Sequence, residues 1–106
     1  MKIETKLAMA AILAAAATTS AFAQAPGADT YKAKCQSCHG AQGIPNPGIA
    51  KAMGVKPAND PSVTSISETQ MIADTTNGKG KMPAFKGKLT DAQIKDSVDY
   101  FRSLGK

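Results

Sequence analysis

Both cysteines and the only histidine of this 106-residue chain lie together, in the stretch KCQSCHG. Cys35 and Cys38 are three positions apart, and His39 follows directly. Two cysteines at this spacing are compatible with a redox dithiol, half of a zinc site, a disulfide or the attachment point of a haem. The neighbouring residues, and what the rest of the chain supplies, decide among these four chemistries.

The sequence disfavours three of these four chemistries: the redox dithiol, the zinc site and the disulfide. A thioredoxin-like dithiol opens a helix within a βαβ pattern, and no alternating strand pattern is evident. Structural zinc takes four ligands, whereas two cysteines and one histidine supply three. A disulfide across two intervening residues closes a very small loop and stabilises little. A thiol redox protein is kept as an alternative, which alkylation of free cysteines would test.

The histidine directly after the second cysteine favours haem, because Cys-x-x-Cys-His is the attachment signature of haem c. A helical turn across Gln36 and Ser37 presents both sulfurs to neighbouring vinyl groups of the porphyrin, which gives two thioether bonds. The next residue then lies beneath the ring, where its imidazole can bind the iron. The sequence therefore predicts one covalent haem c on Cys35 and Cys38, with His39 as an axial ligand.

A haem iron held by one histidine needs a sixth ligand or has an open position, and the candidates are Met53, Met71 and Met82. Met71 lies inside a predicted helix and Met53 ends a short helical turn, so both are expected to pack. Met82 lies in a Gly/Lys loop and precedes Pro83, which fixes the local backbone. We therefore predict Met82 as the second axial ligand. An iron left open would instead indicate a haem enzyme or a gas-binding sensor.

The first 23 residues are typical of a cleaved signal peptide. Two lysines precede an apolar run from Leu7 to Ala17, and the segment ends on Ala21-Phe22-Ala23, which a signal peptidase accepts. The run is too short to span a bilayer, which takes about 20 residues. We expect cleavage after Ala23, export to the periplasm of a bacterium, and a mature chain of residues 24–106.

The mature chain is predicted to be a single small all-α domain. Helical signals cover residues 31–38, where Asp29 is the expected cap, then 67–77 and 90–104, with a short helical turn near 49–54. Residues 40–48 and 55–63 are rich in glycine or proline and are expected to be loops. A domain this small buries little apolar surface and usually depends on a cofactor, metal or disulfide for stability.

Three segments, CQSCHG, GKGKMPAF and LTDAQIKDSVDYFRSL, together resemble the small class I c-type cytochromes of bacteria, over essentially the whole mature chain. The resemblance implies a compact α-helical fold wrapped around one haem with His/Met ligation, and an electron carrier that is not itself an enzyme. Cys35 and Cys38 match the thioether cysteines of the family, His39 the proximal ligand and Met82 the distal one. Pro47 resembles the loop proline whose carbonyl accepts a hydrogen bond from the ligand histidine, with Pro45 as a competitor.

The resemblance also implies a contact between the first and last helices. Gly27 and Tyr31 match a small-residue and aromatic pair that packs against an aromatic of the last helix in this family. Tyr100 or Phe101 is the expected partner.

The mature chain has 11 basic and 7 acidic residues, a formal net charge of +4, and an exported protein rarely meets nucleic acid. We therefore expect an acidic protein partner, contacted through lysines that flank the two motifs: Lys32, Lys34, Lys79, Lys81, Lys86 and Lys88. Candidate partners are a quinol:cytochrome c oxidoreductase, a terminal oxidase, a reaction centre and a periplasmic dehydrogenase. Only peripheral contact with membrane complexes is expected, and a monomer is the default for an electron shuttle.

Overall fold

In this computed structural model of the protein, the described residues are 26–106, and the predicted signal peptide and its cleavage site lie outside them. Within this range the chain folds into short helices and has no named strand, only two isolated bridges. The helices are α1 (Ala28–Lys34), α2 (Gln36–His39), α3 (Pro47–Met53), α4 (Pro61–Thr64), α5 (Glu68–Asn77) and α6 (Asp91–Leu104). The all-α prediction is confirmed.

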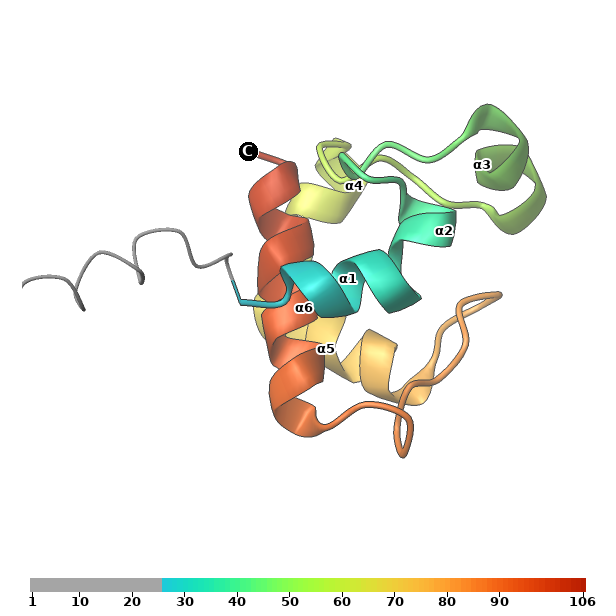
Figure 1. Cartoon of the computed structure of the whole chain (residues 1–106). Helices are drawn as coiled ribbons and strands as arrows, with labels where there is room; N and C mark the ends of the chain where they lie inside the picture. The colour runs from blue at the N-terminus through green and yellow to red at the C-terminus, as the bar shows by residue number, and fades with distance from the viewer. Residues whose placement is uncertain (1–25) are drawn as a thin grey trace, which may run out of the picture.

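The helical body is built around α6, which packs against both α1 and α5 (Figure 1). At the crossing of α1 and α6, a Cβ added to Gly27 would lie 2.1 Å from the carbonyl oxygen of Asp96, so only glycine allows this approach. Tyr31 is 2% exposed, and its ring centroid lies 5.2 Å from that of Tyr100 and 6.3 Å from that of Phe101. The predicted contact between the first and last helices is therefore present, with both aromatic residues of α6.

The α5 and α6 helices begin where the sequence predicts, because each start is capped by a side chain. The Ser67 hydroxyl accepts a hydrogen bond from the backbone N–H of Gln70. Thr90 and Gln93 form a reciprocal capping box at the start of α6. The apolar stripe of α6 is deeply buried at Ile94.

The first helix differs from the prediction at both ends. Its N-terminal cap is Gly27, with φ of 87°, and Asp29 lies within the first turn, where its charge favours the helix dipole. The helix is also interrupted at Cys35, so that α1 ends at Lys34 and α2 carries the residues from Gln36 to His39. The break turns the cysteine–histidine segment into a separate helical turn.

The segment between α2 and α5 is more helical than predicted. The loop after His39 ends at Asn46, whose side chain accepts hydrogen bonds from two backbone N–H groups of α3. Asp60 caps α4 in the same way, by accepting from Ser62. In both cases a proline takes the first helical position, where its missing N–H is not needed. These prolines start helices, whereas the glycine and proline content around them predicts loops.

Candidate functional site

A cavity of about 620 Å³ occupies the position where a larger domain would have its hydrophobic core. Its wall is formed by residues of all six helices and of the loop between α5 and α6. Protein interiors are normally close-packed, and a cavity of 300 to 1,000 Å³ is typical of a small-molecule or cofactor site. In the described part of the chain, fully buried apolar side chains are few: Tyr31, Ala58, Ile94 and Val98.

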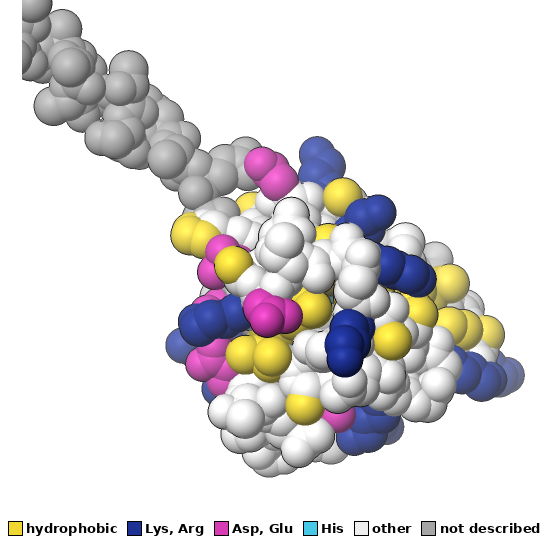
Figure 2. Space-filling model, turned by 90° about the horizontal axis from the view of Figure 1, so that it is seen from below, with side chains coloured by type: hydrophobic (Ala, Val, Ile, Leu, Met, Phe, Trp, Pro, Cys, Tyr) yellow, Lys and Arg dark blue, Asp and Glu magenta, His cyan; other side chains and the backbone are white. Residues whose placement is uncertain are grey.

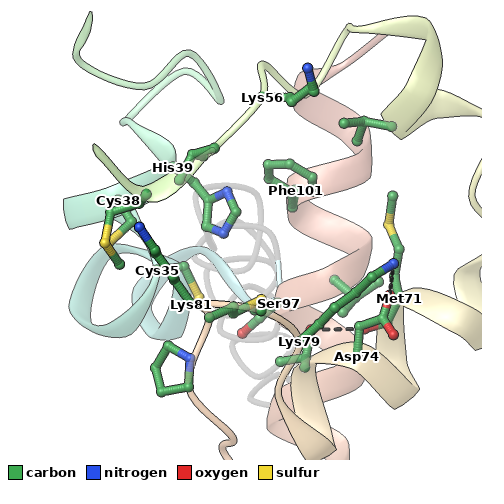
Figure 3. Close-up of a pocket in the computed structure, with 18 of the residues that line it drawn as sticks. Cys35, Cys38, His39, Lys56, Met71, Asp74, Lys79, Lys81, Ser97 and Phe101 are labelled. Carbon is green, nitrogen blue, oxygen red and sulfur yellow. Dashed lines mark hydrogen bonds and ion pairs between the residues drawn. The ribbon is translucent and has the colours of Figure 1, made fainter. Parts of the chain in front are cut away.

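The cavity brings together four residues that the sequence singled out. Cys35, Cys38 and His39 line it from the α1–α2 junction, and Met82 lines it from the loop after α5. Figure 3 shows the His39 ring pointing into the cavity between the cysteine side chains and Phe101. Residues from distant parts of the sequence therefore meet on one cavity, as an iron with two axial ligands requires.

His39 is fixed by packing and has an unpartnered ring nitrogen. Its ring meets the Phe101 ring edge-on, with centroids 5.0 Å apart and an interplanar angle of 64°. Burial lowers the pKa of His39, which favours the neutral imidazole that binds metals. The Nδ1 atom is buried and has no hydrogen-bond partner among the described residues. A buried histidine without a protein partner for this atom fits a ring that belongs to a cofactor site.

The backbone next to His39 is held by Tyr31. The Tyr31 hydroxyl donates a hydrogen bond of 2.6 Å to the carbonyl oxygen of Gly40. Burial, followed by the nearby Cys35 and Tyr100, raises the pKa of Tyr31, so the hydroxyl keeps its proton. The bond ties the end of α2 to α1, across nine positions of the chain.

The two cysteines are half-buried free thiols in this structure. Burial, followed by the proximity of Cys38, raises the pKa of Cys35 to about 11. Reactive redox cysteines have lowered pKa values that favour the thiolate. The environment of Cys35 therefore does not favour the thiol redox alternative.

The three methionines differ in what their sulfur atoms contact. The Nη1 atom of Arg102 lies 3.8 Å from the Met71 sulfur, and the same nitrogen donates a hydrogen bond of 2.8 Å to the Ile66 carbonyl. Met71 is therefore held by a cation that is itself anchored. All three methionines line the cavity, Met53 from the end of α3, Met71 from α5 and Met82 from the loop after α5.

The loop that carries Met82 is folded back on itself and tied to α5. Lys79 and Met82 exchange two backbone hydrogen bonds, of 3.1 and 2.9 Å. Further along, the N–H groups of Phe85 and Lys86 donate to the carbonyls of Thr75 and Thr76 in the last turn of α5. The loop is therefore fixed at both sides of Met82 by its own backbone.

Pro47 is the exposed first residue of α3 and does not line the cavity. Its competitor Pro45 is buried but also lies outside the cavity wall. Because Nδ1 of His39 has no partner, neither carbonyl holds the ring in this structure. The hydrogen-bonding role of Pro47 stays a prediction without structural support.

Lys56 and Phe101 are among the cavity residues that the sequence did not mark as part of the site. Lys56 lines the cavity, although this lysine is distant from both motifs in the sequence. Phe101 contacts the His39 ring, whereas the sequence assigned it only to helix packing. The helical spacing of Phe101 from Ile94 indicates a buried residue, but spacing alone does not say which side chain it meets.

Comparisons with known proteins identify the family. A family model described as "Cytochrome C oxidase, cbb3-type, subunit III" matches residues 22–101. The chain is 34% identical to a cytochrome c6 of Leptolyngbya boryana, over 72% of this chain and 86% of that one. It is 38% identical to a cytochrome c6 of a Nostoc strain, over 76% and 68% of the two chains. This chain belongs to the class I c-type cytochromes.

Two further similarities agree with this assignment. The solved structure of the KustC0563 c-type cytochrome superposes with a TM-score of 0.68 at 28% identity, over 76% of this chain and 99% of that one. The CcoP subunit of a cbb3-type oxidase from Azospirillum brasilense is 33% identical, but the match spans only 30% of that protein. The class I cytochrome c fold and a covalently bound haem c follow from the family, and the cytochrome is an electron carrier.

The cavity of this cytochrome fits that group. It offers two sulfur atoms, an imidazole and a thioether on a largely apolar wall, the donor set of a covalently attached haem. Within residues 26–106, none of the helices has the length and apolar character needed to cross a membrane.

Proposed function

We propose that this cytochrome is an exported electron shuttle in which Cys35 and Cys38 hold the haem by thioether bonds and His39 and Met82 bind its iron. The observation that carries this proposal is the convergence of all four side chains on one cavity. When bound, the haem supplies a one-electron change between ferrous and ferric iron. The protein itself is not an enzyme in this proposal, because both axial positions are filled.

The residues around the cavity have distinct tasks. The turn of α2 presents Cys35 and Cys38 on the same segment as His39, which fixes where the haem is attached relative to its first ligand. Phe101 and the Tyr31–Gly40 hydrogen bond limit movement of the His39 ring and backbone. The Met82 thioether is a soft, neutral ligand that favours ferrous iron, which suits a carrier of high potential.

A closed iron centre distinguishes this proposal from a haem enzyme or gas-binding sensor. With Met82 bound, the reduced protein has no free position for an external ligand. We expect carbon monoxide to leave the visible spectrum of the reduced protein unchanged at neutral pH. Rapid and complete formation of a carbon monoxide adduct would favour the open-iron alternative.

The lysines near the cavity are proposed as a docking surface for an acidic partner. The six lysines predicted from the sequence are all exposed, and three of them, Lys34, Lys79 and Lys81, line the cavity together with Lys56. Figure 2 shows acidic side chains gathered mainly on one side of the visible face and lysines over the rest. This uneven distribution would orient the cavity mouth toward negative charge.

The proposed location is the periplasm, after cleavage behind Ala23. The proposed partners are redox proteins with acidic docking patches: a quinol:cytochrome c oxidoreductase, a terminal oxidase, a reaction centre or a periplasmic dehydrogenase. Support comes from the predicted signal peptide, the excess of lysine and the similarity to cytochromes c6. A monomer is proposed, since a shuttle must present its haem edge to successive partners.

A further inference from the structure

A lysine next to Met82 makes a long-range contact that its position in an exposed loop does not require. The Nζ atom of Lys81 donates a hydrogen bond of 2.9 Å to the carbonyl oxygen of Ala52, 29 positions earlier in the chain. Ala52 lies in the last turn of α3, where carbonyl groups lack partners within the helix. A cation at this end is also favoured by the helix dipole. The contact joins the loop of Met82 to a separate part of the cavity wall.

The α3 segment has few other attachments. It projects from the helical body in Figure 1 and is followed by Gly54, whose φ is 70° and whose absent Cβ would meet no atom within 4 Å. Yet Met53 and Val55, on either side of this glycine, line the cavity. The position of this part of the cavity wall therefore depends on contacts that α3 makes across the cavity, rather than on packing of α3 against the other helices.

A second lysine holds the same loop from the other side. The Lys79 amino group lies 3.7 Å from a carboxylate oxygen of Asp74 on α5. Figure 3 shows the side chains of Lys79 and Lys81 leaving the loop in opposite directions. The loop of Met82 is thus tied to α5 by Lys79 and to α3 by Lys81.

We propose that Lys81 is a positioning residue: its bond to the Ala52 carbonyl closes the cavity between α3 and the loop, and thereby holds Met82 on the iron. This rests on the proposed role of Met82. It also gives Lys81 a task distinct from docking, since its amino group is engaged within the protein, unlike that of Lys86, which has no side-chain partner among the described residues. Removing the bond would detach α3 from the loop, while the backbone bonds and Lys79 still hold the loop to α5. The cavity would then open on its α3 side, so that Met82 leaves the iron more often.

The test compares three variants of the haem-loaded protein: Lys81→Gln, Lys81→Arg and, as a matched control, Lys86→Gln. Lys86→Gln removes the same charge from the same loop. The first measurement is the rate at which imidazole, used as an external ligand, binds the ferric protein. We expect Lys81→Gln to raise this rate about 5-fold, the change that corresponds to loss of one modest interaction. Lys86→Gln should leave the rate unchanged, and Lys81→Arg, which keeps a cationic donor, should restore it.

The second measurement is amide hydrogen exchange of α3, which does not depend on which residue binds the iron. Exchange in residues 47–54 should accelerate in Lys81→Gln and not in Lys86→Gln. Equal exchange in both variants would overturn the proposed bond, and faster exchange without faster imidazole binding would overturn its effect on Met82. If the wild-type ferric protein showed no iron–sulfur charge-transfer band, the role of Met82 would fail instead, while the exchange data would still decide whether Lys81 holds α3.

Discussion

At the scale of single residues, His39 depends on neighbours that limit its freedom without touching the iron. The Phe101 edge contact fixes the plane of the imidazole, and the Tyr31 hydroxyl fixes the backbone one residue later, at Gly40. If His39 is the iron ligand that we propose, a ring held in this way would change little in geometry between oxidation states. Small changes in geometry favour rapid electron transfer, because little reorganisation accompanies each step.

The Tyr31 hydrogen bond can be removed by a single substitution that keeps the ring. Tyr31→Phe leaves the ring in place but removes the donor to the Gly40 carbonyl. We expect a loss of about 1 to 2 kcal/mol in the free energy of unfolding, the range for a part-buried group that loses its partner. Denaturant unfolding of the haem-loaded protein measures this loss.

The control is Tyr100→Phe, because the Tyr100 hydroxyl has no hydrogen bond among the described residues and its ring contact with Tyr31 survives the change. Tyr100→Phe should change stability by less than about 0.5 kcal/mol. Equal losses in the two variants would mean that the hydroxyl of Tyr31 contributes nothing specific.

Cys35, Cys38 and His39 could be selected from the sequence because they form a contiguous signature, and the structure places all three at the cavity, whereas their roles toward the haem stay a proposal. Met82 could also be selected, from the loop and proline around it. The contacts of Phe101, Lys56 and Arg102 could not, since each depends on how distant segments pack. The family resemblance suggested Pro47 as a hydrogen-bond partner of His39, but a resemblance in sequence does not say where the carbonyl lies. In the structure Pro47 is the first residue of α3.

At the scale of elements, capping explains which helices the sequence reveals. The α5 and α6 helices each begin with a hydroxyl side chain that caps a backbone N–H three residues later, so both starts can be predicted from the local sequence. The interruption at Cys35 has no side-chain cap that marks it, and α4 is a single turn of 4 residues, too short for a helical pattern of apolar residues. The α1–α6 crossing was expected only from the family resemblance, because it depends on the absence of a side chain at Gly27.

Gly27 provides a test of that crossing with a well-matched control. Its φ of 87° is close to the 84° of Gly87, but a Cβ would lie 2.1 Å from a carbonyl oxygen at Gly27 and within 4 Å of nothing at Gly87. Gly87→Ala should therefore cost about 1 to 2 kcal/mol, for the left-handed backbone alone. Gly27→Ala should cost at least about 2 kcal/mol more, because the helices must also separate. Thermal or denaturant unfolding of both variants checks this, and similar costs would show that the close approach is unimportant.

At the scale of the whole molecule, the distribution of charge over the surface decides where an acidic partner would bind, more than the net charge does. The acidic residues of α6 pair partly with a lysine of the same helix, Lys95, which contacts Asp99 at 2.7 Å and Glu68 of α5 at 3.3 Å. The lysines around the cavity are exposed, apart from the contacts of Lys79 and Lys81 described above. Four exposed lysines therefore place positive charge at the cavity wall: Lys34, Lys56, Lys79 and Lys81.

The proposed docking surface predicts a salt dependence of electron transfer. The bimolecular rate with an acidic redox partner should fall steeply as ionic strength rises from about 10 mM to 150 mM, since the Debye length shortens from about 30 Å to about 8 Å. Lys34→Gln should lower both the rate at low salt and its salt dependence, whereas Lys106→Gln, which changes an exposed lysine that does not line the cavity, should change neither much. A rate that does not respond to salt would contradict docking through these lysines.

The central claim is that one iron is held by His39 and Met82, and its most direct test is the weak near-infrared band that arises from an iron–sulfur bond to methionine. The ferric wild-type protein should show this band. Met82→Ala should lose it, and Met53→Ala, which removes the other methionine sulfur that lines the cavity without a partner, should keep it. A band that persists in Met82→Ala and disappears in Met53→Ala would contradict the account.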